Sequence, residues 1–181
     1  MEGGAIHSAS GFTPALFPER PWTLITHIFI HGGWLHILRN MLYLWVFGDN
    51  VEDRQGHLKY LIFFFLCGAA AALLQAAVAF WVGNPYIPLI GASGAISGVL
   101  GAYMYYYPRA RVFGFVPLGI FLLAVEWPAE VFIGLWFVYQ VINGIFFLHL
   151  GVQGGVAWFA HIGGFLVGYA LAPLFGRPPR I

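Results

Sequence analysis

Long apolar runs separated by short polar connections dominate the chain. Four runs approach the roughly 20 residues that a membrane-spanning helix needs, and they cover residues 60–82, 89–107, 131–150 and 156–175. A fifth run, residues 28–47, is weaker because histidines, Arg39 and Asn40 interrupt its first half. Such polar groups have to face protein or water and not lipid. The pattern therefore predicts five spanning helices.

The runs show no period-2 alternation, which excludes a membrane barrel. Composition points the same way, since 60% of the residues are apolar and 8% are charged, against about 25% charged in a typical soluble domain. We predict an all-α fold, a polytopic transmembrane helical bundle. The expected organisation is an external or interfacial segment at residues 1–25, a membrane domain at residues 26–175 and a cytoplasmic tail at residues 176–181.

Lysine and arginine predict the orientation of the helices, because cytoplasmic loops carry an excess of both. The segment before the first helix holds Arg20, and three later segments hold Arg54 and Lys59, Arg109 and Arg111, and Arg177 and Arg180. The connections at residues 83–88 and 151–155 carry none. We therefore place residues 48–59, residues 108–111 and the C-terminus in the cytoplasm, and the other connections outside.

Residues 112–125 must not span the membrane in this orientation. Fourteen residues interrupted by Pro117 are too short to cross and are expected to be interfacial or re-entrant. The orientation also places Met1 outside with no helix to carry it there. A further helix is therefore expected upstream, missing either because the sequence is a fragment or because its start site is misplaced.

Polar residues within the predicted helices share the outer half of the membrane. They are His31, His36 and Asn40 in the first helix, Ser93 and Ser97 in the third, and His161 in the fifth. Each costs a few kcal/mol at such a depth unless it has a partner or water. Their common depth favours one shared site.

Small residues recur at helical spacing on two of these helices. They are Ser93, Ser97 and Gly101 in the third helix, and His161, Gly164 and Gly168 in the fifth. Two such faces allow a close crossing, which could bring a serine hydroxyl within about 3 Å of an imidazole. The alternative is ordinary helix packing, since small-residue motifs also occur without a catalytic role.

A serine close to a histidine suggests a nucleophile and its general base. His36 and Asn40, four residues apart on one helical face, could donate to a developing oxyanion, or each could be a structural polar residue. The acids near the helices fall on the cytoplasmic side, and they are Asp49, Glu52, Asp53, Glu126 and Glu130. The sequence therefore offers a Ser–His dyad without an acidic third member.

These residues resemble the rhomboid family of intramembrane serine proteases. HGGWLHILRN (31–40) looks like the family's His-x4-His-x3-Asn element, GASG (91–94) like its GxSG, and AHIGGFLVG (160–168) like its final AHxxG-x3-G. VEDR (51–54) resembles the Glu-x-Arg element of its cytoplasmic loop. The resemblance covers residues 26–175, and three spaced motifs in the right order are far more specific than one.

The resemblance implies that Ser93 is the nucleophile and His161 the general base. His36 and Asn40 would form part of an oxyanion hole beside the Ser93 backbone N–H. The resemblance also implies cleavage of substrate transmembrane helices near their outer ends, at small residues in helix-destabilised stretches. The expected partners are transmembrane protein substrates and the lipid bilayer, and no cofactor is required.

Three further residues have implied structural roles. Glu52 and Arg54 would stabilise the cytoplasmic loop, and His31 would brace the outer end of the first helix. The expected location is a bacterial or archaeal cell membrane, with multiple spans and the active site toward the outer face.

The chain departs from the family pattern in two respects. The family core has six helices, and the first of them is missing from the five predicted here. The family also often carries an aromatic residue one turn after the serine, where it stacks on the histidine. This chain has Ser97 at that position.

Two other functions are kept as alternatives. One is a catalytically inactive rhomboid-like protein that binds membrane helices for quality control, although both the serine and the histidine are present. The other is a transporter or channel in which His27, His31, His36 and His161 bind a metal or relay protons. No carboxylate or cysteine joins these histidines, and the HExxH metalloprotease motif is absent, so no metal site is predicted.

Two remaining features limit the possible functions. A net charge of +1, with no basic run, gives no support for a nucleic-acid partner. The single cysteine, Cys67, lies within an apolar run and is expected to be a packing residue.

Overall fold

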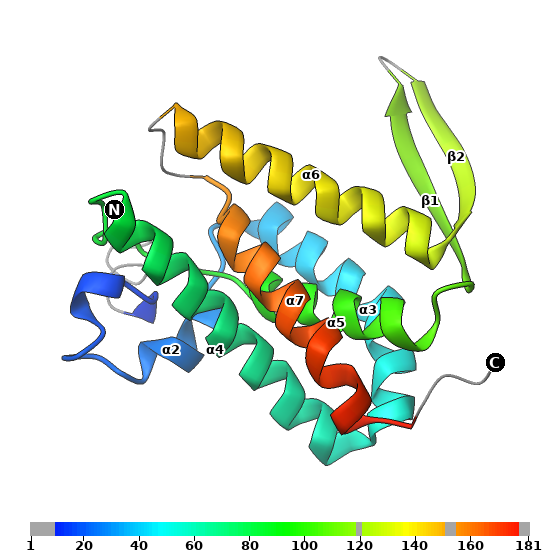
Figure 1. Ribbon diagram of the computed structural model, residues 1–181, viewed down its shortest axis with the longest axis horizontal. Coiled ribbons are helices and arrows are strands. Elements are labelled where there is room, and N and C mark those ends of the chain that lie inside the picture. Colours follow the sequence, from blue (N-terminus) through cyan, green and yellow to red (C-terminus); the bar gives the residue numbers. More distant parts are fainter. Residues whose placement is uncertain (1–9, 119–120, 151–154, 178–181) are drawn as a thin grey trace.

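The computed structural model describes residues 10–118, 121–150 and 155–177 (Figure 1). Parts of four predicted segments lie outside the described residues. They are residues 1–9 of the N-terminal segment, residues 119–120 of the segment 112–125, most of the connection at 151–155, and the end of the tail with Arg180.

Five long helices form the described bundle. They are α3 (Trp34–Gln55), α4 (His57–Trp81), α5 (Ser93–Tyr106), α6 (Ala129–His149) and α7 (Trp158–Phe175). Three short helices precede them, η1 (Pro14–Leu16), α2 (Thr23–Thr26) and η2 (His27–Phe29). Helix α5 is the innermost, since most of its residues are buried against α7, α4 and α3 (Figure 1). The predicted all-α helical bundle is confirmed.

The first predicted helix, residues 28–47, has different boundaries in the structure. It begins at Trp34 and continues to Gln55. Gly33 precedes it and Gly56 follows it, with φ values of 151° and 81° that glycine adopts without a steric penalty. The last residues of this helix are polar, so hydropathy alone predicts that it ends before them.

Helix α5 is shorter than its predicted span of residues 89–107. Leu89 pairs with Phe12 through two backbone hydrogen bonds of 2.9 and 2.8 Å, and the N–H of Gly91 donates to the carbonyl of His27 at 2.9 Å. These contacts hold the chain out of a helix until Ser93. The 14 residues of α5 make a helix of about 21 Å, which is too short to cross a hydrocarbon core of about 30 Å.

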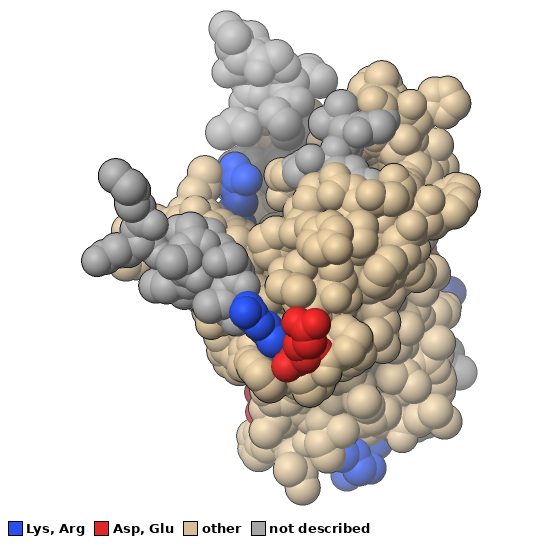
Figure 2. Space-filling model, turned by 90° about the vertical axis from the view of Figure 1, so that its left-hand side faces the viewer, with Lys and Arg blue, Asp and Glu red and all other residues tan. Residues whose placement is uncertain are grey.

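Three of the described helices, α4, α6 and α7, are long and apolar enough to span a membrane. Helix α5 is too short, and α3 contains five charged residues, which are Arg39, Asp49, Glu52, Asp53 and Arg54. By length and composition, the prediction of five spanning helices therefore holds for three of them. On the face seen in Figure 2, charged side chains are few and most of the surface is uncharged, as expected for a membrane protein.

Within the predicted segment 112–125, residues 112–118 and 121–125 belong to two paired strands that the sequence analysis does not predict. Strand β1 (Arg111–Leu118) pairs antiparallel with β2 (Phe121–Pro128) over their whole length. Valine and aromatic residues, which favour strands, are frequent in both. Both ends of the hairpin join the same end of the bundle, between α5 and α6 (Figure 1). The segment therefore does not cross the bundle, and its position at the membrane surface stays a prediction.

Glycines allow α5 and α7 to cross in close contact. A Cβ atom added at Gly164 would overlap the carbonyl oxygen of Gly94, and one added at Gly101 would overlap the carbonyl oxygen of Phe165. Backbone cannot move aside as a flexible side chain can, so larger residues do not fit. The two small-residue stripes face each other, and their crossing sets the distance between the first turns of the two helices.

Candidate active site

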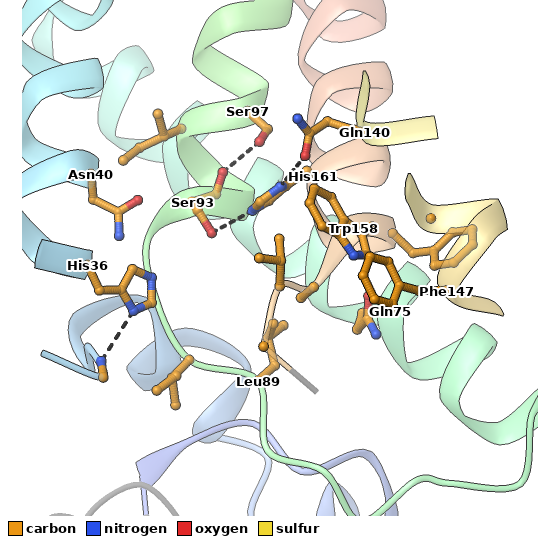
Figure 3. Close-up of a pocket in the computed structure, with 18 of the residues that line it drawn as sticks. His36, Asn40, Gln75, Leu89, Ser93, Ser97, Gln140, Phe147, Trp158 and His161 are labelled. Atoms are coloured by element: carbon orange, nitrogen blue, oxygen red, sulfur yellow. Dashed lines mark hydrogen bonds between the residues drawn. The ribbon is translucent and has the colours of Figure 1, made fainter. Parts of the chain in front are cut away.

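A cavity of about 1020 Å³ lies where the first turns of α5 and α7 approach α3 and α6. Its polar lining side chains include His36, Asn40, Gln75, Ser93, Ser97, Gln140 and His161 (Figure 3). The structure thus brings Ser93, His161, and the pair His36 and Asn40 to one cavity from three distant parts of the sequence.

Ser93 and His161 form a hydrogen bond across the helix crossing. The Nε2 atom of His161 lies 2.9 Å from the Oγ atom of Ser93 (Figure 3). Ser93 is the first residue of α5, and His161 lies in the first turn of α7. A serine hydroxyl in contact with an imidazole nitrogen is the arrangement in which the imidazole can accept the hydroxyl proton.

Ser97 does not take the place of an aromatic ring on the imidazole. Its hydroxyl donates to the backbone carbonyl of Ser93 at 2.7 Å. The rings nearest to His161 are those of Trp136, with centroids 6.1 Å apart, and Trp158, with centroids 6.5 Å apart. The aromatic contacts to the histidine therefore come from α6 and from α7 itself, and not from α5.

Gln140 is a residue of this cavity that the sequence analysis does not identify. It lies on α6 and is buried, and its Oε1 atom is 2.8 Å from Nδ1 of His161. The sequence signal for it is a polar side chain inside an apolar run, which is the criterion that selects Ser93 and His161. Gln140 and the two tryptophans belong to no motif of the sequence, so the motif comparison passes over them.

His36 and Asn40 face Ser93 from α3, on the other side of the cavity (Figure 3). The backbone N–H of Gly32 donates to Nδ1 of His36 at 3.2 Å, so the proton of a neutral imidazole lies on Nε2. A Cβ atom added at Gly91 would lie 2.7 Å from this Nε2 and 3.7 Å from Nδ2 of Asn40. Glycine at position 91 therefore keeps a side chain out of the space beside these two donors.

Asn40 has an unsatisfied donor. Its side chain is buried, and its Nδ2 atom has no hydrogen-bond partner within the part of the chain that the structure describes. Buried amide donors are normally paired. An unpaired donor at the edge of a cavity can bond to a molecule that enters the cavity and reaches it.

Two further histidines lie outside the long helices, before α3. Burial lowers the pKa of His27 and of His31 below the usual histidine value, because a buried site disfavours the charged ring. The Nδ1–H of His27 donates to the carbonyl of Thr23 at 3.0 Å, and the ring of His31 packs edge-on against that of His36, 5.1 Å away. Among the described residues, no three His, Cys, Asp or Glu side chains gather as a metal site would require.

Glu52 and Arg54 lie at the end of α3 that is remote from the cavity. Oε1 of Glu52 is 2.5 Å from Nδ1 of His57. Nε of Arg54 donates to the hydroxyl of Tyr107 at 3.0 Å, and the guanidinium lies 4.9 Å from the centre of the same ring. These contacts join the end of α3 to the start of α4 and to the end of α5, which supports a structural role for both residues.

A family model and several known proteins are similar to this chain. The model of the Rhomboid domain matches residues 18–178. The rhomboid protease GluP of Bacillus subtilis is 31% identical over 157 residues, which cover 87% of this chain and 26% of GluP. The rhomboid protease GlpG of Salmonella choleraesuis is 30% identical over 168 residues, or 89% of this chain and 50% of GlpG.

A plant relative shows the same pattern of similarity. RHOMBOID-like protein 4 of Arabidopsis thaliana is 30% identical over 162 residues, which cover 84% of this chain and 34% of the relative. The chain thus spans at most half the length of these curated relatives. Because the domain match extends over most of the sequence and the helices are apolar, the chain is an integral membrane protein that belongs to the rhomboid family.

Proposed function

We propose that this protein is a serine endopeptidase that hydrolyses peptide bonds in or near the transmembrane segments of membrane proteins, with Ser93 and His161 as its catalytic dyad. The observation that carries the proposal is the 2.9 Å hydrogen bond between Ser93 Oγ and His161 Nε2, in a cavity of an apolar helical bundle that several polar side chains also line. The family includes intramembrane serine proteases, and two relatives are named rhomboid proteases.

The reaction uses the two side chains in sequence. Nε2 of His161 accepts the proton of the Ser93 hydroxyl while Oγ attacks the carbonyl carbon of the scissile bond. The resulting imidazolium gives this proton to the leaving amine as the C–N bond breaks, which leaves an acyl-enzyme. Water then attacks the ester, again with His161 as the base, and the carboxylic acid product leaves Ser93 in its starting state.

The negative oxygen that develops during each attack needs hydrogen-bond donors. Nε2–H of His36 and Nδ2 of Asn40 line the same cavity, and the Nδ2 donor has no partner within the described residues. The backbone N–H of Ser93 is one of the first N–H groups of α5, which have no acceptor inside their helix. Three donors in this position would stabilise the tetrahedral intermediate, and the reaction requires no metal ion or cofactor.

The proposed setting of the enzyme follows from the charge pattern and the resemblance. The membrane domain is taken as residues 26–175, and lysine and arginine place the tail and residues 48–59 in the cytoplasm. The cavity then opens toward the outer face of a bacterial or archaeal cell membrane. Substrates would be transmembrane proteins cut near the outer ends of their helices.

A fluorophosphonate probe tests the proposal directly, because it reacts with an activated serine. We expect the wild-type protein to be labelled and Ser93→Ala to remain unlabelled. Ser97→Ala is the matched control, since it removes a neighbouring hydroxyl of the same cavity and should leave labelling in place. Absence of labelling in folded wild-type protein would contradict the proposal and would favour an inactive membrane-helix-binding protein.

Cleavage of a transmembrane reporter tests the dyad as a unit. We expect Ser93→Ala and His161→Ala each to abolish cleavage without unfolding the protein. The double variant should be no worse than either single variant, because nucleophile and base act together and their losses do not add. A double variant far less active than both singles would mean that the two residues act independently.

A further inference from the structure

We propose that Gln140 is a positioning residue for His161, which it holds in the tautomer and the orientation that accept the Ser93 proton. The inference rests on the proposed function, in which His161 is the general base. Gln140 is 3% exposed and points at the imidazole from α6, whereas Ser93 contacts the same ring from α5 (Figure 3).

The two nitrogens of His161 have chemically different partners. Nδ1 lies 2.8 Å from the amide oxygen of Gln140, and Nε2 lies 2.9 Å from the hydroxyl of Ser93. An amide oxygen can only accept a hydrogen bond, so the proton of the neutral ring is on Nδ1. Nε2 then keeps its lone pair for the serine hydroxyl, which is the state that a general base requires.

The backbone of Trp136 determines which way the amide of Gln140 points. Nε2 of Gln140 donates to the carbonyl oxygen of Trp136, one turn earlier on α6, at 3.2 Å. If the amide were turned over, its oxygen would face that carbonyl oxygen, and the hydrogen bond to Trp136 would be replaced by a repulsive contact between two acceptors. The amide oxygen therefore has one favourable position, and in that position it accepts from His161.

An uncharged acceptor suits the surroundings of this histidine. A buried carboxylate without a complete set of partners is costly in an apolar interior, whereas an amide fixes the tautomer without adding a charge. Ser97 bonds to the Ser93 carbonyl and not to the ring. Gln140, together with the ring of Trp136, thus supports the imidazole from α6 in a chain that lacks an aromatic residue at position 97.

Three variants on α6 separate positioning from packing. Gln140→Leu removes the acceptor and puts an apolar side chain of similar size in its place. Gln140→Glu keeps an acceptor but adds a charge. Asn143→Leu is the matched control. The Asn143 amide also donates to the carbonyl four residues earlier, that of Tyr139 at 2.7 Å, but it does not line the cavity.

The measurements are kcat and KM for a transmembrane reporter, the rate of fluorophosphonate labelling, the pH dependence of kcat/KM, and the melting temperature. Gln140→Leu should lower kcat and the labelling rate by about 10-fold, the value of one buried hydrogen bond, with KM and melting temperature close to wild type. In Gln140→Leu, the acid limb of the kcat/KM profile, where activity falls as pH is lowered, should move to lower pH, because the imidazolium of His161 loses an acceptor. Gln140→Glu should move that limb to higher pH, because a carboxylate stabilises the imidazolium.

Other titratable or charged side chains that line the cavity are unchanged in all three variants, and they are His36, Arg39, Tyr43 and Tyr139. A displaced acid limb therefore reports the residue at position 140. The inference is overturned if Gln140→Leu keeps the wild-type kcat and acid limb, or if its loss is matched by Asn143→Leu. Should Gln140→Leu fail to fold, an unmoved acid limb in Gln140→Glu overturns it. A wild-type protein without Ser93-dependent labelling would instead contradict the proposed function itself.

Discussion

Asn40 contributes a buried amide donor that has no partner within the described residues and lines the cavity of Ser93. If this donor acts mainly on the tetrahedral intermediate, it contributes to kcat and little to substrate binding. We expect Asn40→Ala to lower kcat by about 10² to 10³ while KM and fluorophosphonate labelling of Ser93 stay measurable.

A structural role for Asn40 gives a different result. Removal of a structural asparagine would lower the melting temperature and disturb the packing of α3 before it affected the chemistry. The oxyanion role would be falsified if Asn40→Ala kept a near-normal kcat, or if its loss of activity followed an equal loss of folded protein.

The candidate site is predictable from the sequence where polar residues interrupt apolar helices. Ser93 and His161 stand out by that criterion, and the structure brings them within hydrogen-bonding distance of each other. Gln140 meets the same criterion but belongs to no motif. Which polar residue contacts which nitrogen of the ring depends on how α6 packs on α7, and no periodicity in the sequence encodes that packing.

The crossing of α5 and α7 depends on glycines that no larger residue can replace. We expect Gly164→Ala to destabilise the protein by about 1–3 kcal/mol, because its Cβ atom would overlap the carbonyl oxygen of Gly94. Activity should fall as well, since the two first turns would separate. Thermal unfolding in detergent and reporter cleavage measure the two effects.

Gly134→Ala is the control for this substitution. Gly134 lies within α6, and a Cβ atom added there would meet nothing within 4 Å. Alanine also has the higher helix propensity, so the melting temperature should stay the same or rise. Equal melting temperatures for Gly164→Ala and the wild-type protein would mean that the crossing is not as tight as described.

Hydropathy predicts where the helices lie but not where each one begins. The late start of α5 depends on the pairing of Leu89 with Phe12, two residues that are distant in sequence and not linked by any local pattern. The C-terminal end of α3 is helical although its residues are polar, so hydropathy places the end of this helix too early. The β-hairpin has the valine and aromatic content of strands, but the same apolar residues also suit a membrane segment, and only the structure distinguishes these possibilities.

The orientation of the whole molecule can be tested with single cysteines. Cys67 is fully buried and should not react in the wild-type protein. A cysteine at Tyr86, which is exposed and lies in a connection without lysine or arginine, should react with an impermeant thiol reagent from outside. The cysteine of Arg109→Cys should react with this reagent only after the membrane is permeabilised. Reversed accessibility would place the cavity on the cytoplasmic side.

The volume of the cavity has a consequence for the supply of solvent. Liquid water occupies about 30 Å³ per molecule, so a cavity of about 1020 Å³ has room for on the order of 30 waters. Each turnover of a hydrolase consumes one. If the proposed acyl-enzyme forms with this space filled by water, its lifetime is set by the chemistry at Ser93 and by the departure of the first product, and not by the passage of water across an apolar layer.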